Sequence, residues 1–125
     1  MSFKEPYEEL FGFTPELTEK RHNFSAEVMP EVLEIHEVFR KKCMHSNILD
    51  EKVSQMILFA ILSSHMRNGA RVHAISSRRL GATWEELHSV ANLVFLFSGL
   101  SAMNFSISIL SDLRNEEENS KGLQI

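Results

Sequence analysis

The sequence predicts an all-α protein of six to seven helices, and three observations support this class. Apolar residues recur three and four positions apart along most of the chain. No stretch alternates apolar with polar residues over many positions, and valine is sparse, which argues against a sheet. Gly (5) and Pro (3) are few, so long helices with few turns are expected. A chain of this length predicts a single domain over 1–125, with its core in 25–114.

The first half of the chain predicts three helices. One covers 5–11, with Pro6 in its first turn and Gly12 as its stop. Thr14 caps the second, which takes Pro15 as its first residue and ends near position 22. The third follows Pro30, and its apolar side is expected to face the core. That side comprises Val32, Leu33, His36, Phe39 and Cys43.

The strongest helical pattern follows Asp50, a capping residue, and runs over 50–66. One apolar stripe runs along this helix, and Leu58, Phe59 and Leu62 cover the other side, so we expect the helix to be buried on all sides. The stripe comprises Val53, Met56, Ile57, Ala60, Ile61 and Ser64. A break at Asn68-Gly69 precedes a shorter helix over 70–80, which Gly81 ends in a left-handed cap.

A capping box, Thr83-Trp84-Glu85-Glu86, opens the next helix, which is apolar on most sides over 84–97. A last helix is expected over 101–114, and the charged tail 115–125 is expected to be frayed. Because the helices over 50–66 and 84–97 are apolar almost all round, a monomer of this size would struggle to cover both. We therefore expect a homo-oligomer.

Composition excludes several classes of protein. The formal net charge is −4, with no basic excess, so we expect no nucleic-acid partner. The longest apolar run, 56–62, is too short to span a bilayer, and the polar start is not a signal peptide. The single cysteine fits a reducing compartment, so a cytoplasmic location is expected. The histidines lack the close spacing of a metal site, so neither a metal nor another cofactor is predicted.

Residues 49–99 carry a recognisable set of features. Leu49-Asp50-Glu51-Lys52 opens the buried helix, and His73 lies on the next helix. Leu80-Gly81-Ala82-Thr83 then leads into Glu85-Glu86-Leu87, and Gly99 precedes the last helix. As a set, these features resemble the carboxymuconolactone decarboxylase family, which includes the alkyl hydroperoxidase D-like proteins. The resemblance implies an all-helical fold, usually assembled as a trimer or a hexamer.

The peroxidase branch of that family uses a Cys-x-x-Cys pair followed by a histidine, which His73 would match. Met66 and Gly69 stand at the cysteine positions, and Gln55, or Ser54 without a gap, stands at a glutamate position. A dithiol peroxidase needs one thiolate to attack the peroxide and a second thiol to resolve the sulfenic acid. We therefore expect no such activity. Cys43 is interpreted as a small buried residue.

The decarboxylase branch needs no cysteine. Its chemistry requires a cation for the substrate carboxylate and an acid that protonates carbon. We expect His73 to be the catalytic acid, and Gln55, His65, Arg67 and Arg71 to bind a small anionic carbonyl or lactone ligand. Arg67 and Arg71 would share a helix face if that helix begins early. The alternative is a non-enzymatic helical oligomer that binds a ligand or partner.

Overall fold

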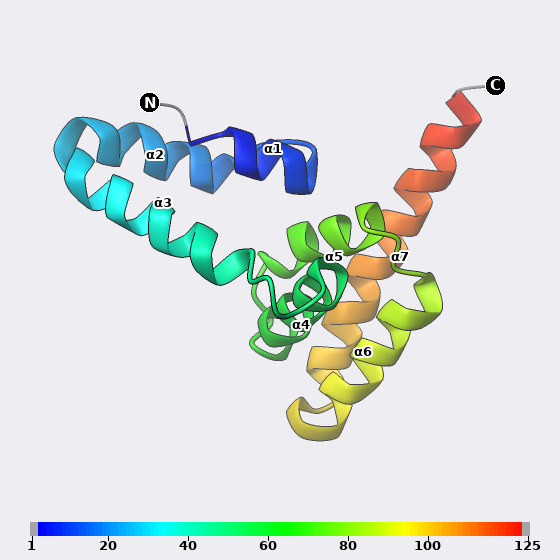
Figure 1. The fold of residues 1–125 in the computed structure, drawn as a ribbon. Coiled ribbons are helices and arrows are strands. Elements are labelled where there is room, and N and C mark those ends of the chain that lie inside the picture. Colours follow the sequence, from blue (N-terminus) through cyan, green and yellow to red (C-terminus); the bar gives the residue numbers. More distant parts are fainter. Residues whose placement is uncertain (1–2, 124–125) are drawn as a thin grey trace. The chain divides into compact units, whose positions relative to one another are not determined.

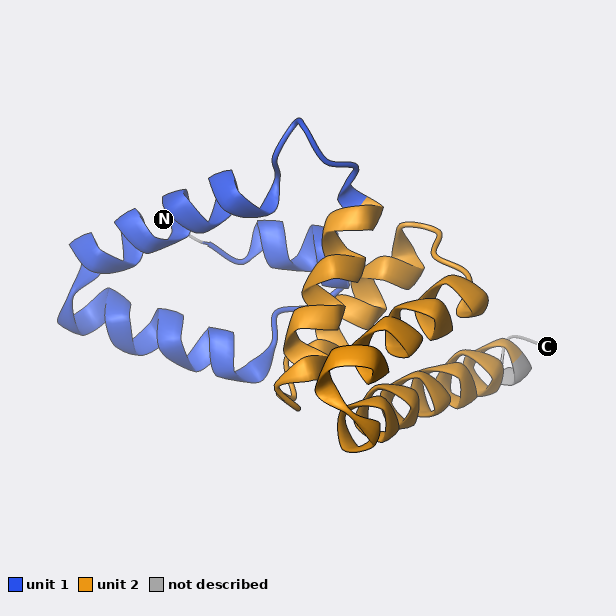
Figure 2. Ribbon diagram, turned by 90° about the horizontal axis from the view of Figure 1, so that it is seen from below, with its two compact units in different colours: residues 1–51 blue, residues 52–125 orange. Residues whose placement is uncertain are grey.

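The computed structural model describes residues 3–123, and the side chains of residues 3–121. This part of the chain forms helices and no strand (Figure 1), which confirms the all-α class. The chain divides into two compact units, residues 1–51 (unit 1) and 52–125 (unit 2), which Figure 2 colours separately. Each unit is described by itself below, and the single domain expected over 1–125 stays a prediction.

Unit 1 contains α1 (Glu5–Phe11), α2 (Glu16–Val28) and α3 (Pro30–Met44). The end of α1 is as predicted, because Gly12 adopts the left-handed conformation with φ of 86°. The predicted limits of α2 are wrong at both ends. Pro15 lies just outside the helix, and α2 continues six residues past position 22. It ends at Val28, because the proline that follows Met29 disfavours helical backbone at Met29.

The prediction of which side of α3 faces inward is also wrong. Of the five residues expected there, Leu33 is buried, whereas Val32, Phe39 and Cys43 are exposed. The other buried side chain of α3 is Glu37, one turn after Leu33. Cys43 is therefore not a core residue.

The buried carboxylate of Glu37 explains this orientation, because it joins the three helices of unit 1. It accepts hydrogen bonds from the Tyr7 hydroxyl of α1 at 2.9 Å and from Arg21 Nη2 of α2 at 2.7 Å, and it lies 2.9 Å from His22 Nε2. Burial raises the pKa of Glu37, but these hydrogen bonds lower it more, so the pKa lies below its usual value. Glu37 is therefore a charged centre of unit 1.

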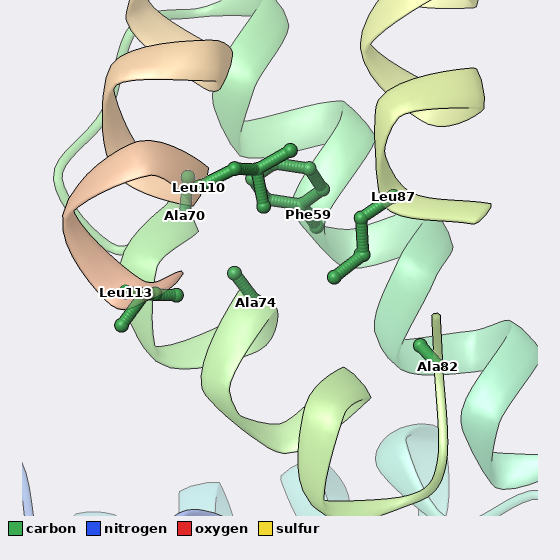
Figure 3. Packing of buried hydrophobic residues seen from close by; sticks show 7 residues of the cluster. All are labelled: Phe59, Ala70, Ala74, Ala82, Leu87, Leu110 and Leu113. Carbon is green, nitrogen blue, oxygen red and sulfur yellow. The ribbon is translucent and has the colours of Figure 1, made fainter. Parts of the chain in front are cut away.

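Unit 2 contains α4 (Glu51–Ser64, all but its first residue), α5 (Ala70–Arg79), α6 (Trp84–Ser98) and α7 (Leu100–Leu123). Phe59 lies at the centre of its core, with Leu87 of α6 and Leu110 of α7 beside its ring (Figure 3). Ala70 and Ala74 line the α5 side of this core. Their small side chains permit close approach of the α5 backbone.

Within one chain, α4 is not buried on all sides. Val53, Ile57 and Ile61 are exposed, and the buried residues are Gln55 and, one and two turns later, Phe59 and Ser63. The reason is a hydrogen-bonded contact of Gln55 with α5, described below.

The turn between α5 and α6 agrees with the prediction. Gly81 has a left-handed φ of 98°. Thr83 Oγ1 accepts from the Glu86 amide at 3.0 Å, and Glu86 Oε1 accepts from the Thr83 amide at 2.9 Å, so the capping box is confirmed. Glu86 also forms an ion pair with Lys52 at 3.1 Å, which links the first turn of α6 to α4.

The last helix is longer than predicted. It continues through Leu123, nine residues past Arg114, so most of the tail expected to be frayed is helical. Two ion pairs explain the extension, because Glu116 and Glu117 bind Arg71 and Arg78 of α5, each at 2.7 Å. The final two positions of the predicted tail, 124–125, lie outside the described residues.

The Glu37 cluster predicts a pH-dependent stability. A Glu37→Gln variant should lose about 2 kcal/mol of unfolding free energy at neutral pH, because Arg21 loses its buried counterion. Since the folded-state pKa of Glu37 is lowered, this contribution is present above its usual pKa and disappears as the pH falls through the folded-state value.

Urea unfolding followed by circular dichroism, at about pH 7 and about pH 3, measures this difference. The exposed Glu34→Gln change on the same helix is the control. Equal midpoints for Glu37→Gln and Glu34→Gln at neutral pH would contradict the structural role given to Glu37.

Candidate functional site

Two of the five residues expected at the site meet inside unit 2. His73 Nδ1 of α5 lies 2.8 Å from Gln55 Oε1 of α4, and both side chains are buried, at 8% and 1% exposure. Ser76, one turn after His73, donates from Oγ to the same Gln55 oxygen at 2.6 Å. The oxygen of this buried amide thus has two partners on one neighbouring helix.

The hydrogen bonds around His73 determine its tautomer. The Ser77 hydroxyl donates to the His73 backbone carbonyl at 2.7 Å. The Ser76 hydroxyl lies 3.0 Å from the same carbonyl but closer to Gln55, so its single proton points to Oε1. Since Gln55 presents its oxygen, His73 Nδ1 carries the hydrogen, and the lone pair of the neutral ring lies on Nε2.

This arrangement has a definite chemical capacity. Gln55 holds the imidazole by an acceptor that is neutral, so it orients the ring without adding a negative charge. A ring fixed in this way can take up a proton at Nε2 and release it, as a general acid or base does. Gln55 is then a positioning residue, and His73 is the candidate catalytic residue.

The sequence pattern of α5 accounts for the placement of His73. Ala70, His73, Ala74 and Ser77 are buried and follow one another at helical spacing, so they share one face. Alanines on either side of His73 leave room for the imidazole beside α4. The face that carries the candidate catalytic residue is therefore the face that packs in the core.

Arg71 does not lie with this pair. Its guanidinium binds the Glu116 carboxylate of α7 through Nη2, at 2.7 and 2.9 Å, on a partly exposed side of α5. The condition for Arg67 and Arg71 to share a helix face, an early start of the helix, is not met, because α5 begins only at Ala70. Arg67 lies in the preceding turn, where Arg67 and His65 are both exposed.

The two positions that would hold the dithiol also lie in or beside this turn. Met66 is exposed and has a left-handed φ of 51°, and Gly69 immediately precedes α5. Cys43 belongs to unit 1, whereas His73 belongs to unit 2. Neither Met66 nor Gly69, the residues at the two cysteine positions, carries a thiol.

Sequence reasoning missed Ser76 and Ser77, although a signal was present. Gln55 stands on an apolar helix and needs hydrogen-bond partners if buried, and small hydroxyl residues one turn after a candidate histidine can provide them. Among the described residues, no three His, Cys, Asp or Glu side chains are grouped so that they could hold a metal ion.

Comparison with known proteins does not add to this picture. No family model matches the chain, and no curated protein matches it.

The Gln55 hydrogen bonds predict an effect on stability. Replacing Gln55 with methionine, which is similar in length, should cost about 1–3 kcal/mol of unfolding free energy, because the Ser76 hydroxyl and His73 Nδ1–H lose a buried acceptor. Gln55→Glu keeps an acceptor and should retain more of this stability. Urea unfolding of the parent, Gln55→Glu and Gln55→Met measures their free energies of unfolding, which should decrease in that order. A Gln55→Met variant as stable as the parent would contradict this prediction.

Proposed function

We propose that this chain is a carboxymuconolactone decarboxylase-like protein that binds a small anionic carbonyl or lactone ligand and acts on it through His73. The observation that carries the proposal is the buried Gln55–His73 hydrogen bond, which orients the imidazole ring. The motifs around Gly81 and Thr83 support the same family.

The proposed reaction is the decarboxylation of a lactone acid with a vinylogous carbonyl. The bond to the carboxylate breaks, carbon dioxide leaves, and the electron pair moves into the carbonyl system as a dienolate. The His73 imidazolium then donates its Nε2 proton to carbon. This step leaves the ring neutral with hydrogen on Nδ1, which is the tautomer that Gln55 stabilises.

Arg71, with Arg67 and His65 in the exposed turn, stays a prediction for binding the substrate carboxylate, because Arg71 does not lie with the Gln55–His73 pair. Because Arg71 is already paired with Glu116, a ligand carboxylate has to exchange with that glutamate. Exposed ion pairs of this kind contribute little to stability, so the exchange costs little.

Dithiol peroxidase activity is not part of the proposal. That reaction forms a sulfenic acid on one thiol, and a second thiol of the same site resolves it. The chain has one cysteine, Cys43, and Met66 and Gly69 stand where the pair would be. Neither a thioether nor a glycine can carry out either step.

A second candidate function is a non-enzymatic helical oligomer that binds a ligand or partner. Large exposed apolar side chains favour an oligomer for either function. On α4 they are Val53, Ile57 and Ile61, and a second group surrounds the α6–α7 turn, where Phe97 is 95% exposed. The other members of that group are Leu93, Phe95, Leu96 and Leu100.

We propose that a second copy of the chain covers these residues, and by resemblance that the assembly is a trimer or a hexamer. None of the helices in the described part of the chain has the length and hydrophobicity needed to cross a bilayer. We also propose a cytoplasmic location, which the single cysteine favours.

The enzymatic proposal predicts turnover of a lactone acid. The full chain incubated with carboxymuconolactone should release carbon dioxide, and His73→Gln should reduce kcat about 100-fold or more, because the proton donor is lost. His88→Gln, which changes an exposed histidine of α6, is the matched control. Turnover that survives His73→Gln would refute the role of His73, and absence of turnover would leave the scaffold as the favoured function.

The oligomer predicts a solution mass well above the 14.4 kDa of one chain. Light scattering at micromolar concentration should give a multiple of this mass. The double change Leu93→Ser with Phe97→Ser should reduce it, because two exposed apolar contacts are lost. Asn92→Ala, on an exposed position of the same helix, should leave it unchanged. A parent protein of 14.4 kDa would contradict the proposed assembly.

A further inference from the structure

Unit 1 contains a cavity of about 530 Å³ that shares no lining residue with the candidate site of unit 2. Its lining comes from α1 and the second half of α3, from Phe3 and His45 beside these helices, and from Glu51, the first residue of α4. All of these lie within residues 3–51. This volume is in the range of pockets that hold small molecules.

One part of the lining is cationic. The Arg40 guanidinium lies over the Tyr7 ring, with Cζ 4.1 Å from the ring centroid. Glu37, the buried carboxylate that also lines the cavity, is already bound by Tyr7, Arg21 and His22. In the described part of the chain, no carboxylate accepts a hydrogen bond from Arg40.

Arg40 is consequently a preoriented donor. Stacking on Tyr7 fixes the plane of the guanidinium, while its N–H groups are available to a ligand. Lys41, the next residue, adds a second positive charge to the lining. A planar guanidinium with a neighbouring ammonium is suited to binding a carboxylate.

Other parts of the lining are anionic or apolar. Two carboxylates of α1, Glu5 and Glu9, line the cavity, and Glu5 forms no ion pair within residues 3–121. Glu51 also lines the cavity and is paired with His45 at 2.7 Å. Phe3, Pro6 and Val38 supply apolar surface.

The combination determines the class of ligand. The carboxylates of Glu5, Glu9 and Glu51 would repel a simple anion, and Arg40 and Lys41 would repel a simple cation. A molecule with both charges avoids either repulsion. Apolar surface between the charged groups favours a ligand with an apolar body.

We propose that the cavity of unit 1 binds a small zwitterion with an apolar body, such as an apolar α-amino acid. Its carboxylate binds Arg40 and Lys41, its ammonium group is attracted by Glu5, and its apolar body contacts Phe3, Pro6 and Val38. The proposal involves only unit 1, so it does not depend on the chemistry proposed for His73.

Isothermal titration of the full chain with L-leucine and with L-phenylalanine tests this proposal. At least one of them should bind. Its N-acetyl derivative, which lacks the ammonium charge, and its amide, which lacks the carboxylate, should each bind about tenfold more weakly or worse.

A matched pair of variants locates the site. Lys41→Gln should weaken binding about tenfold, whereas Lys42→Gln, which removes the same charge from an exposed residue outside the lining, should not. Arg40→Gln should weaken it further, with circular dichroism confirming that the variant is folded.

Three results would overturn the proposal. One is the absence of binding by both amino acids. Another is equal affinity for an amino acid and either of its derivatives, which would indicate a site for a plain anion or cation. The third is an equal effect of Lys41→Gln and Lys42→Gln, which would indicate attraction to the net charge of the helix and not to the cavity.

Discussion

The hydrogen bonds to Gln55 Oε1 are the constraint on which unit 2 depends. An uncharged amide on an apolar helix can be buried only where donors meet it, and α5 supplies two, from His73 and Ser76. This requirement turns the Gln55–Phe59 face of α4 toward α5 and leaves Val53 and the apolar residues beyond it exposed. One polar contact therefore orients the candidate catalytic ring and also exposes the surface assigned to oligomer contacts.

Unit 1 is organised in the same way around a charge. Glu37 receives hydrogen bonds from α1 and α2, and this turns α3 so that apolar residues such as Phe39 face outward. In both units a buried polar side chain outweighs the apolar periodicity of its helix. Burying such a group without its partners would cost about 1–3 kcal/mol, comparable with the burial of one apolar side chain.

Local signals were sufficient to predict much of the fold. The helices, the left-handed turns at Gly12 and Gly81 and the capping box at Thr83 depend on neighbouring residues, so the sequence predicts them. Which helix faces are buried, and where α7 ends, depends on contacts between residues distant in the sequence, such as Glu116 with Arg71. A local sequence pattern does not predict such contacts. Gln55 and His73 could be chosen as candidates from the sequence, and the position of Ser76 one turn after His73 was a signal that could have added it.

The most direct test of the account is the protonation of the His73 ring. Long-range ¹H–¹⁵N correlation spectra of the labelled protein, at a pH where the ring is neutral, distinguish the two nitrogens, and the His73→Gln variant identifies the signals. The account predicts hydrogen on Nδ1 in the parent and loss of that preference in Gln55→Met. A neutral ring with hydrogen on Nε2 in the parent would mean that Gln55 does not orient His73 as an acid or base, and would contradict the central claim.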